Sequence, residues 1–554
     1  MTNTILLDER DNVATLTNPA FKGDTIKILG GDEIHCVEDI PIWHKVSLRP
    51  IRAGEKIFKY GEIIGAASID IAKGAWVSHE NIFSVPRDYS SEYLTEKFSV
   101  PEIFWVLSEK ARQRSGNIYR RNFDEILKSH GIDNDAEKIN EILRLCQREH
   151  INVIRDGEVY ISAGSGLYGT FYGYKRAQGR AGIRNHVLIL PTCACGSETA
   201  RIVASQVRGA VNIIFNTGCS DVQANTDLSQ KILTGFALNP NVFGVVIIGL
   251  GCETVPHAKL REKIQSLTSK PVVSFGIQEV GGTLKTIELA VRAARDLAAE
   301  AALQQKELCD ISELLMGIEC GGSDATSGIA SNPAVGKLSD KLIDLGASTL
   351  MSESIEWIGG EHVLAKRAAT PELHNKIIQI CADYEAHLKS AGQDCRAGQP
   401  TPGNKDGGLS TIDEKSLGCI RKGGTRPIVE VLNQAERPTK RGAIVMDTAG
   451  YDISSVTSMV AAGCNAIIFT TGRGTPTGNA IVPVLKVTAN AKTFSWMADN
   501  IDVDLSGIID GNLTIDGAGD LLLEKIRDVC NGRLTKAEAY GFSDIAVDHV
   551  CRFV

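Results

Sequence analysis

Small oxygen-bearing side chains crowd the sequence directly after a cysteine. In the segment MGIECGGSDATSGIASNPAVG, Cys320 is followed by a Gly-Gly pair and then by Ser323, Asp324, Thr326 and Ser327. Hydroxyl and carboxylate groups at this spacing can donate and accept several hydrogen bonds, as a polyhydroxylated ligand requires. The alternative is that Ser327 or Ser331 caps the helix that the following residues predict.

Three cysteines occupy corresponding places in successive strand-turn patterns. Cys219 ends NTGC, Cys252 follows GLG and Cys320 follows GIE, and each has a glycine nearby that lets the backbone turn closely. One such cysteine alone is typical of a buried structural thiol. Their shared placement favours a group of metal-binding or redox-sensitive thiols, and both interpretations stay open. Glu253, directly after Cys252, is a candidate catalytic carboxylate.

Cationic and polar residues gather near the same predicted strand ends. Arg184 and Asn185 precede the strand HVLILPT, and an arginine there could bind a carboxylate through two parallel hydrogen bonds. Two later glycine-rich loops add further candidates, namely Lys405, Lys422, Thr471 and Arg473. Long charged loops between apolar strands are usually functional, so we include all six residues in the candidate site.

Alternating strand and helix patterns must position these residues. The apolar runs at 186–192, 211–217, 242–250 and 270–276 are typical of buried parallel strands, and helical patterns such as 197–208 and 283–305 separate them. A second such unit has strand patterns at 313–319, 347–353, 442–448 and 465–472. The sequence therefore predicts two doubly wound parallel α/β domains, at 170–308 and 309–554, with ligands beyond the carboxyl ends of their strands.

The N-terminal part has a different character. Short strand patterns broken by glycines predict a small β domain over 1–87, and the continuous segment HKVSLRPIRAGEKIFKYGEIIGAASIDIAKGAWVSHENI resembles the SAF domain, a β-clip module. From 88 to 165, helical patterns lead into the strand pair INVIRDGEVYIS, which indicates a helical, winged-helix-like insert. Its mixed charge favours a packing or oligomer contact over a DNA-binding role.

Composition narrows the class of protein. With 554 residues and 43% hydrophobic content, the chain is long enough for several cores. A net charge of -8 without a dense basic block argues against a nucleic-acid partner, and no apolar run is long enough for a membrane span. The N-terminus lacks a secretion signal, so we expect a cytoplasmic protein whose 14 cysteines are mostly thiols.

Five long motifs together resemble the altronate and galactarate dehydratase family. They are GYKRAQGRAGIRN, NPNVFGVVIIGLGCE, CGGSDATSGIASNPAVG, TPGNKDGGLSTIDEKSLG and FTTGRGTPTGNAIVPVLKVTAN. The resemblance implies a hydro-lyase that removes water from an aldonate or aldarate to give a 2-keto-3-deoxy sugar acid. Abstraction of the α proton would be followed by loss of the neighbouring hydroxyl. A homo-oligomer, such as a dimer, is expected.

The resemblance also implies a divalent metal, usually iron (Fe²⁺, with Mn²⁺ as an alternative). A metal that chelates the substrate would stabilise the charge that develops in the transition state. We expect its ligands among Cys219, Cys252 and Cys320, either as a mononuclear site or as an iron-sulfur cluster. The family pattern His-x-His-Asn corresponds here to His79, Glu80 and Asn81, so His79 is a catalytic candidate although its partner histidine is absent.

Two other functions fit parts of the pattern. A sulfo-lyase would eliminate sulfite from a sulfolactate-like 2-hydroxy acid, but the resemblance implies that such enzymes lack the Cys-Glu pair found here at Cys252 and Glu253. A non-catalytic sugar-acid sensor would use the insert as its output module. Turnover distinguishes the two classes, because a sensor would bind a sugar acid without forming a 2-keto acid.

Overall fold

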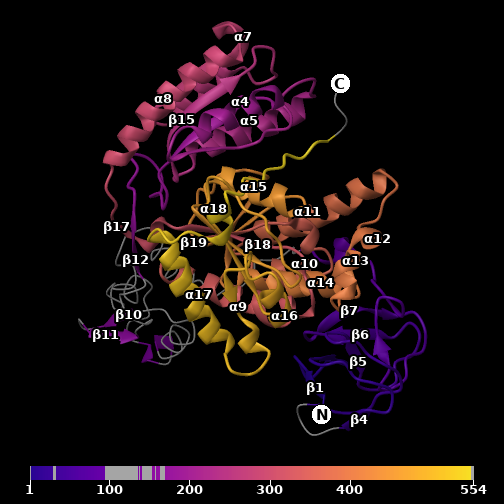
Figure 1. Ribbon diagram of the computed structural model, residues 1–554. Coiled ribbons are helices and arrows are strands. Elements are labelled where there is room, and N and C mark those ends of the chain that lie inside the picture. Colours follow the sequence, from indigo (N-terminus) through magenta and orange to yellow (C-terminus); the bar gives the residue numbers. More distant parts are fainter. Residues whose placement is uncertain are drawn as a thin grey trace.

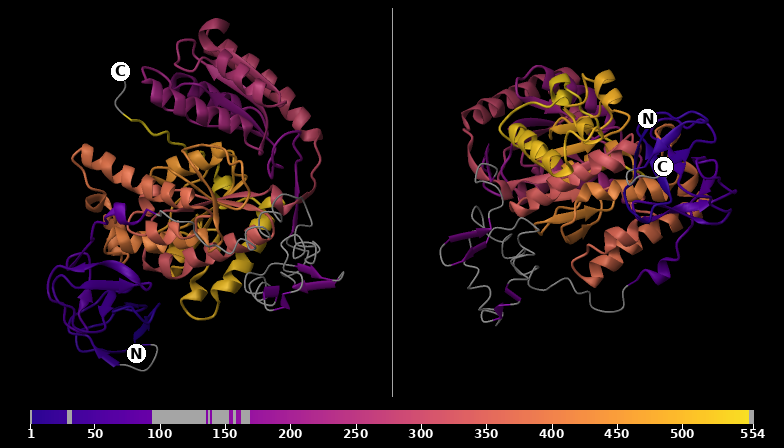
Figure 2. Two further views of the ribbon diagram at one scale, coloured as in Figure 1. Left: turned by 180° about the vertical axis from the view of Figure 1, so that it is seen from behind. Right: turned by 90° about the horizontal axis from the view of Figure 1, so that it is seen from below.

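The computed structural model describes residues 2–28, 33–93, 135–136, 138–139, 153–155, 158–161 and 169–550. A strand-rich N-terminal domain lies at one end, an α/β domain with a four-stranded sheet lies at the other, and a larger α/β domain lies between them (Figures 1 and 2). The predicted fold class, a small β domain followed by parallel α/β sheets, is confirmed.

The N-terminal domain contains two sheets. The larger has the order β4(Glu33–His35), β3(Thr25–Lys27), β1(Thr2–Ile5), β2(Val13–Leu16), β5(Lys45–Ser47), β8(Trp76–Val77), and the smaller contains β6(Lys56–Lys59), β7(Glu62–Ala67) and β9(Ile82–Phe83). Tyr60 and Gly61 connect β6 to β7 with φ angles of 64° and 73°, as a tight hairpin turn requires. The Asp11 carboxylate accepts hydrogen bonds from both of their backbone N–H groups and thereby stabilises the turn.

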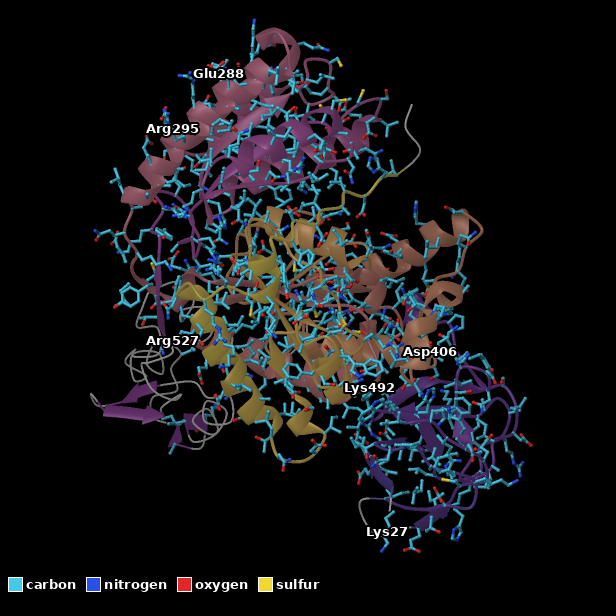
Figure 3. The ribbon with its side chains drawn as sticks, viewed as in Figure 1. Lys27, Glu288, Arg295, Asp406, Lys492 and Arg527 are labelled. Atoms are coloured by element: carbon cyan, nitrogen blue, oxygen red, sulfur yellow. The ribbon has the colours of Figure 1, made fainter. Side chains whose placement is uncertain are left out.

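The α/β domain at the far end has a parallel sheet of order β14-β13-β15-β16. Its elements are β13(His186–Pro191), α4(Ala194–Ser205), β14(Ala210–Asn212), α5(Gln223–Leu238), β15(Val242–Gly249), α6(His257–Leu267), β16(Val272–Gly276), α7(Ile277–Val280) and α8(Thr283–Leu303). Beyond Asn212 the predicted strand 211–217 leaves the sheet, because the backbone of Phe215 bonds to the hydroxyl of Ser197 instead. Glu288 and Arg295 project outward from α8 (Figure 3).

A two-stranded antiparallel sheet joins the two α/β domains. The chain enters the four-stranded domain through β12(Thr170–Gly173) and leaves it through β17(Glu307–Asp310), and these strands pair with each other. In the preceding segment, β10(Val153–Arg155) and β11(Glu158–Ile161) pair antiparallel, so the predicted strand pair is confirmed. The predicted helices and the winged-helix character of the insert fall almost wholly outside the described residues.

The central domain is built on a seven-stranded parallel sheet. Its order is β20(Ile428–Leu432), β21(Ala443–Met446), β19(Ser348–Met351), β18(Leu315–Cys320), β22(Ala466–Thr470), β23(Val484–Thr488), β24(Val503–Asp504). The chain passes from β18 to β19 on one side and later returns to β22 on the other side. A crevice is therefore expected at the carboxyl end of β18, where the strand order reverses.

Helices and short turns surround this sheet. They are α9(Asn332–Asp344), α10(Glu361–Ala365), α11(Pro371–Ser390), α12(Cys395–Gly398), α13(Pro402–Asp406), α14(Ile412–Cys419), α15(Asp452–Ala462), α16(Ala491–Trp496), α17(Ile515–Cys530) and α18(Lys536–Tyr540), with shorter turns η1(Tyr89–Ser91), η3(Ile311–Glu313), η4(Ser327–Ser331), η5(Ser354–Glu356), η6(Ile420–Gly423) and η7(Ser506–Ile508). None of the helices in the described ranges is long and apolar enough to span a membrane.

A buried ion triad attaches the N-terminal domain to the central domain. Lys45 Nζ lies 2.9 Å from Glu414 Oε2, and Lys59 Nζ lies 2.8 Å from Glu414 Oε1. All three side chains are almost completely inaccessible to solvent. Burial alone would raise the pKa of Glu414, but the two ammonium groups more than offset this and hold the pKa well below its usual range. Glu414 in α14 therefore holds two strands of the other domain in place.

We expect Glu414→Gln to lower the midpoint of thermal unfolding by about 10 °C. The substitution leaves two buried ammonium groups without their counter-ion, and breaking a buried pair costs about 3–5 kcal/mol. The matched control is Glu288→Gln, which removes the exposed Arg292–Glu288 pair and should shift the midpoint by only about 1–2 °C. Equal midpoints for the two variants in differential scanning calorimetry would show that the triad contributes little to stability.

Candidate active site

Two groups of potential metal ligands lie at the carboxyl edge of the seven-stranded sheet. One group contains Cys320, Glu356 and Cys419, and the other contains Glu319, Glu353 and Asp452. Within each group one ligand atom per residue lies within 4.8 Å of the others. These are the groups of this kind in the described ranges, and all members except the partly buried Asp452 are buried.

The sheet and its connecting turns bring these six residues together. Glu319 and Cys320 end β18, Glu353 follows β19 and Asp452 begins α15. Glu353 has φ 71° and ψ 70°, a left-handed conformation that costs a residue with a side chain about 1–3 kcal/mol. A hydrogen bond of 2.8 Å from its backbone N–H to Thr448 Oγ1 helps to hold it there. The turn directs Glu353 toward the end of the neighbouring strand β18, where its Oε2 accepts the backbone N–H of Cys320.

Lys422 connects the two groups. Its Nζ lies 2.6 Å from Glu353 Oε2 and 2.6 Å from Glu356 Oε2, and its side chain is 1% exposed. Lys415 Nζ lies 3.5 Å from the other oxygen of Glu356. Lys422 was predicted as a catalytic residue, and the structure places it inside this network rather than in an open pocket.

The acidic groups of the network differ in their protonation. Burial raises the pKa of Glu319 to about 8, and burial also raises the pKa values of Glu353 and Asp452. Glu356 is equally buried, but Lys422 and Lys415 more than offset burial and lower its pKa. The lysines therefore neutralise Glu356, whereas the other three carboxyl groups lack sufficient positive charge.

Two thiols lie beside this network. Cys320 Sγ is 3.8 Å from Cys419 Sγ and 3.2 Å from Ser323 Oγ. The contact with Cys419 lowers the pKa of Cys320 to about 7, and the pKa of Cys419 rises correspondingly. Cys320 thus has a nearby thiol partner, but this partner is Cys419 of α14, which is not one of the three predicted metal-binding cysteines.

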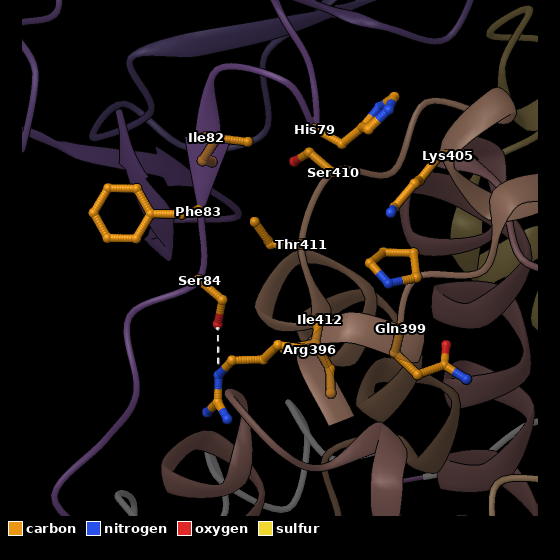
Figure 4. A pocket seen from close by; sticks show the side chains of 11 residues that line it. His79, Ile82, Phe83, Ser84, Arg396, Gln399, Lys405, Ser410, Thr411 and Ile412 are labelled. Atoms are coloured by element: carbon orange, nitrogen blue, oxygen red, sulfur yellow. Dashed lines mark hydrogen bonds between the residues drawn. The ribbon is translucent and has the colours of Figure 1, made fainter. Parts of the chain in front are cut away.

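A separate polar pocket lies between the N-terminal domain and the central domain. Its volume is about 270 Å³, which is slightly below the range typical of pockets for drug-sized ligands. It is lined by His79, Ile82, Phe83, Ser84, Arg396, Gln399, Pro400, Lys405, Ser410, Thr411 and Ile412 (Figure 4). The hydroxyl, amide and cationic groups in this lining suit a small polar anion.

The structure brings the predicted residues His79 and Lys405 into this pocket from different domains. Figure 4 shows the ends of both side chains on the same side of the cavity. Arg396 is already engaged, because its Nη2 donates to Glu385 Oε1 at 2.8 Å and its Nε donates to Ser84 Oγ. Within the described residues, Lys405 is thus the lining cation whose ammonium group has no hydrogen-bonded or ionic partner in the protein.

One lysine connects the pocket to the buried network. Lys415 Nζ donates to Oε1 of Gln399 at 2.9 Å, and Gln399 lines the pocket. The same ammonium group lies 3.5 Å from Glu356. A second connection runs through α13, where Asn404 Nδ2 donates to the backbone oxygen of Ser323. The pocket and the carboxyl edge of the sheet are therefore neighbouring parts of one polar region.

Comparison with known families agrees with this architecture. Residues 2–85 match the altronate/galactarate dehydratase SAF domain, 173–302 match the second domain of D-galactarate dehydratase/altronate hydrolase, and 311–552 match the D-galactarate/altronate dehydratase C-terminal domain. The chain is also 31% identical to galactarate dehydratase (L-threo-forming) of Escherichia coli, over 96% of this chain and 93% of that protein. The chain belongs to the galactarate/altronate dehydratase family. It is accordingly an enzyme, a carbon-oxygen lyase.

Two further relatives differ in their named activities. Altronate dehydratase of Bacillus subtilis is 29% identical over 99% of both chains. The beta subunit of (2R)-sulfolactate sulfo-lyase from Chromohalobacter salexigens is 40% identical over 380 residues, which are 68% of this chain and 97% of that subunit. Because the chain belongs to a family of enzymes, a non-catalytic sensor is not favoured. The names of the relatives differ in their substrates, so the family alone does not identify the substrate.

Arg184 does not have the position expected for a substrate clamp. Its Nε and Nη2 bond to the Glu538 carboxylate at 2.7 and 3.0 Å, and its other N–H groups donate to backbone oxygens of residues 183, 529 and 533. All five donors are therefore used inside the protein. The neighbouring Asn185 donates to the backbone oxygen of Ala301. Both residues join α8 and the C-terminal segment to β13, which corrects the expectation that they bind substrate.

The three predicted metal-binding cysteines do not converge. Cys219 and Cys252 are exposed in the four-stranded domain, whereas Cys320 is buried in the seven-stranded domain. Neither exposed thiol belongs to a ligand group in the described ranges. The sequence interpretation was wrong because strand-end positions in two different sheets look alike, although only strands of one sheet share an edge. A mononuclear site or iron-sulfur cluster on these three thiols is therefore not supported.

Glu253 stabilises a loop. Its carboxylate accepts hydrogen bonds from the backbone N–H groups of Leu250, Gly251 and His257 and from Thr192 Oγ1. Burial alone would raise its pKa, but the backbone donors more than offset this and hold the pKa below its usual range. With its oxygens engaged in this way, Glu253 is unsuited to the catalytic role expected from its place beside Cys252.

The predicted oxygen cluster is bonded mainly to itself. Asp324 accepts hydrogen bonds from Thr326 Oγ1, from the backbone N–H of Ser327 and from Asn490 Nδ2, and burial raises its pKa. Ser327 Oγ bonds back to the Asp324 backbone N–H. Because the side chains satisfy one another in the interior, they do not present the open set of donors expected for a polyhydroxylated ligand. Ser323 differs, since its hydroxyl contacts the Cys320 thiol.

The second predicted loop packs against this cluster. The backbone N–H groups of Gly472 and Arg473 donate to the backbone oxygen of Gly322, and Thr471 Oγ1 accepts the N–H of Gly474. Thr471 is therefore a buried structural residue, whereas the side chain of Arg473 is exposed. A side chain at Gly472 would collide with Asp324, which explains the glycine at this position.

Sequence reasoning missed most of the acidic network. The residues not identified were Glu319, Glu353, Glu356, Asp452, Lys415 and Cys419 as a group. Their available signal was position, since Glu319 and Glu353 lie at or just after the ends of β18 and β19. Asp452 and Cys419 are contributed by helices, so strand-end patterns alone could not identify them.

We expect Arg184→Ala to reduce stability without changing substrate binding. The substitution removes the ion-pair partner of the partly buried Glu538 carboxylate and one donor to each of three backbone oxygens, so the thermal midpoint should fall by about 10 °C. The KM of the folded fraction should stay within about twofold of the original value, and Glu538→Gln should reproduce the loss of stability. A normal midpoint combined with a large loss of kcat/KM would instead support the substrate clamp.

Proposed function

We propose that this enzyme dehydrates a sugar acid, an aldonate or aldarate, to a 2-keto-3-deoxy acid in the pocket between the N-terminal and central domains. The observation that carries the proposal is the meeting of His79 and Lys405 in that pocket, where hydroxyl and amide groups surround them. A sugar acid offers one or two carboxylates and several hydroxyls. Such a ligand would use both the positive charge and the hydrogen-bonding groups of the lining.

The lining supports distinct roles for the two residues. The ammonium group of Lys405 would pair with the substrate carboxylate, which makes loss of the proton on the adjacent carbon easier because negative charge accumulates there. The imidazole of His79 would transfer a proton, since histidine is the side chain most often used for this step and His79 lines the pocket from the N-terminal domain. The side-chain amide of Gln399, whose Oε1 accepts from Lys415, would donate from its Nε2 to a sugar hydroxyl.

We also propose that the enzyme uses a divalent metal, with iron as Fe²⁺ or alternatively Mn²⁺. When bound, such an ion supplies Lewis-acid stabilisation of developing negative charge. The chain offers two donor sets that fit an ion, namely Cys320, Glu356 and Cys419, and Glu319, Glu353 and Asp452. Lys415, which lies 3.5 Å from Glu356 of the first set and bonds to the pocket residue Gln399, would hold the pocket wall in a fixed position relative to this region.

A second candidate function has one observation in its favour. The sulfolactate sulfo-lyase beta subunit aligns over 380 residues at 40% identity, and residues 173 to 552, which contain the two α/β domains, are also 380 residues. Elimination of sulfite from a sulfolactate-like 2-hydroxy acid begins with the same loss of an α proton. Dehydration is preferred because relatives that match nearly the whole chain, including the N-terminal domain, are named as dehydratases.

The setting of the enzyme is proposed on more general grounds. Its small-molecule substrate, the absence of a basic block in the sequence and its family support a cytoplasmic enzyme that forms a homodimer and has no nucleic-acid partner. Sedimentation velocity of the full chain measures the oligomeric state directly.

The proposed function is tested with a panel of aldonates, aldarates and sulfolactate, under anaerobic conditions with ferrous iron. We expect at least one sugar acid to give a 2-keto acid, detected with semicarbazide. Release of sulfite from sulfolactate, with no 2-keto acid from any sugar acid, would support the second function instead. No product from any compound would contradict both.

We expect Lys405→Ala and His79→Gln each to lower kcat/KM by about 100-fold or more. The first removes the carboxylate partner and the second removes the proton carrier, and proton transfer by a positioned side chain is worth about 10²–10⁴-fold. The matched control is Lys73→Ala, an exposed lysine of the N-terminal domain outside the pocket, which should leave kcat/KM unchanged. If all three variants have the same kcat/KM, the pocket is not the active site.

A further inference from the structure

Glu319 presents a buried oxygen without a hydrogen-bond donor. Its Oε2 accepts a hydrogen bond of 2.5 Å from Ser455 Oγ, but its Oε1 has no hydrogen-bond partner among the described residues, and the side chain is completely inaccessible. A buried carboxylate oxygen without a partner carries a substantial free-energy penalty. The oxygen therefore requires a proton or a cation.

The groups around Glu319 are acidic, and its side chain can share a proton with the Glu353 carboxyl group. The carboxylates of Glu353 and Asp452 complete its group, with ligand atoms within 4.8 Å of one another. Lys422 lies beside this group, but its ammonium is shared between Glu353 and Glu356. Glu319 and Asp452 form no ion pair within the described ranges.

The network as a whole contains more acidic than basic side chains. Four carboxylates, at Glu319, Glu353, Glu356 and Asp452, face the two ammonium groups of Lys415 and Lys422. If all four acidic side chains were ionised and the thiols neutral, the formal charge of the network would be minus two. A buried excess of this size is costly, and either one divalent cation or two protons would neutralise it.

The positions of the lysines show where the missing charge belongs. Glu356 contacts both lysines, at 2.6 and 3.5 Å, so it is already compensated. The ligand group that contains the two cysteines also contains Glu356, so the negative charge of its carboxylate is already balanced by lysines. The charge that is not balanced belongs to the other group, Glu319, Glu353 and Asp452, which offers only oxygen ligands. This group lies at the carboxyl end of β18, where the strand order reverses and where ligands bind in open α/β sheets.

We propose that Glu319, Glu353 and Asp452 bind one divalent cation. Three carboxylates form a hard-oxygen ligand set, which suits Mn²⁺, Mg²⁺ or Fe²⁺ better than a thiophilic ion. This inference rests on the proposed metal dependence and assigns the ion to residues other than the cysteines. The competing state is a triad that shares protons and binds no metal.

Mn²⁺ binding to the full-length enzyme tests the proposal. After removal of bound metal with a chelator and exchange into metal-free buffer, Mn²⁺ is titrated and the free ion is measured by electron paramagnetic resonance. We expect one Mn²⁺ per chain and an increase in the thermal midpoint at saturating Mn²⁺. Glu319→Gln and Asp452→Asn should each weaken Mn²⁺ binding by about 100-fold or more, since even residues that only support metal ligands contribute about 10–100-fold.

Cys419→Ser is the matched control, because it alters the other donor set without changing the oxygen triad. It should retain Mn²⁺ affinity within about threefold. In addition, Co²⁺ bound to the original enzyme should show no intense sulfur-to-cobalt charge-transfer band. Loss of Mn²⁺ binding in Cys419→Ser, or a strong charge-transfer band with Co²⁺, would place the ion on the thiols and overturn the proposal. Absence of Mn²⁺ binding to the original enzyme would favour the shared protons and would also overturn it.

The two proposals can fail separately. If Mn²⁺ binds to the triad but no compound in the substrate panel reacts, the metal site stands and the proposed function fails. If a sugar acid gives a 2-keto acid in chelated enzyme that binds no Mn²⁺, the function stands and the metal site fails. Circular dichroism of each variant verifies that a loss of binding is not a loss of folding.

Discussion

A buried group of carboxyl side chains that outnumbers its lysines, at the carboxyl edge of the seven-stranded sheet, is the constraint around which the central domain is organised. Glu319 comes from β18, Glu353 and Glu356 from the turn η5 and its start, and Asp452 from α15, and among the described residues Lys415 and Lys422 are the cations that pair with this group. Buried like charges repel strongly, so the surrounding backbone must hold them in place. The left-handed conformation of Glu353 and the tight packing around Gly321, where a side chain would collide with Asp452, show that backbone geometry maintains this arrangement.

The same constraint relates the two halves of the proposed active site. Helix α14 has Glu414 near its start and Cys419 at its end, so one helix contacts both the N-terminal domain and the buried network. The ion triad around Glu414 fixes the N-terminal domain, which brings His79 to the pocket. From the adjoining residue, Lys415 extends to Gln399 in the pocket wall. Docking of the domains and electrostatic balance in the core are therefore coupled through α14.

Sequence patterns identified the repeating architecture better than the chemistry. Long apolar runs predicted β13, β15 and β18 because buried parallel strands have no polar face, whereas β20 and β23 were missed because Glu430 and the fully buried Lys486 interrupt their runs. Lys486 is accommodated because its ammonium donates to the backbone oxygen of Thr477.

The candidate residues were harder to predict than the strands. His79 and Lys405 were identified and do share a pocket, although they come from different domains. Arg184, Glu253 and Asp324 were misinterpreted because a sequence does not show whether a charged side chain already has partners inside the protein. Contacts between residues far apart in the sequence, such as that between Cys320 and Cys419, depend on the tertiary fold.

The most direct measurement of this account is the location of the metal in a crystal of the full-length enzyme soaked with Mn²⁺. An anomalous difference map collected near the manganese absorption edge shows the position of the ion without reference to activity. The account predicts one strong peak between the carboxylates of Glu319, Glu353 and Asp452, with Lys422 still paired to Glu356. A peak bound by Cys320 and Cys419, or a fully ordered triad without any peak, would contradict it.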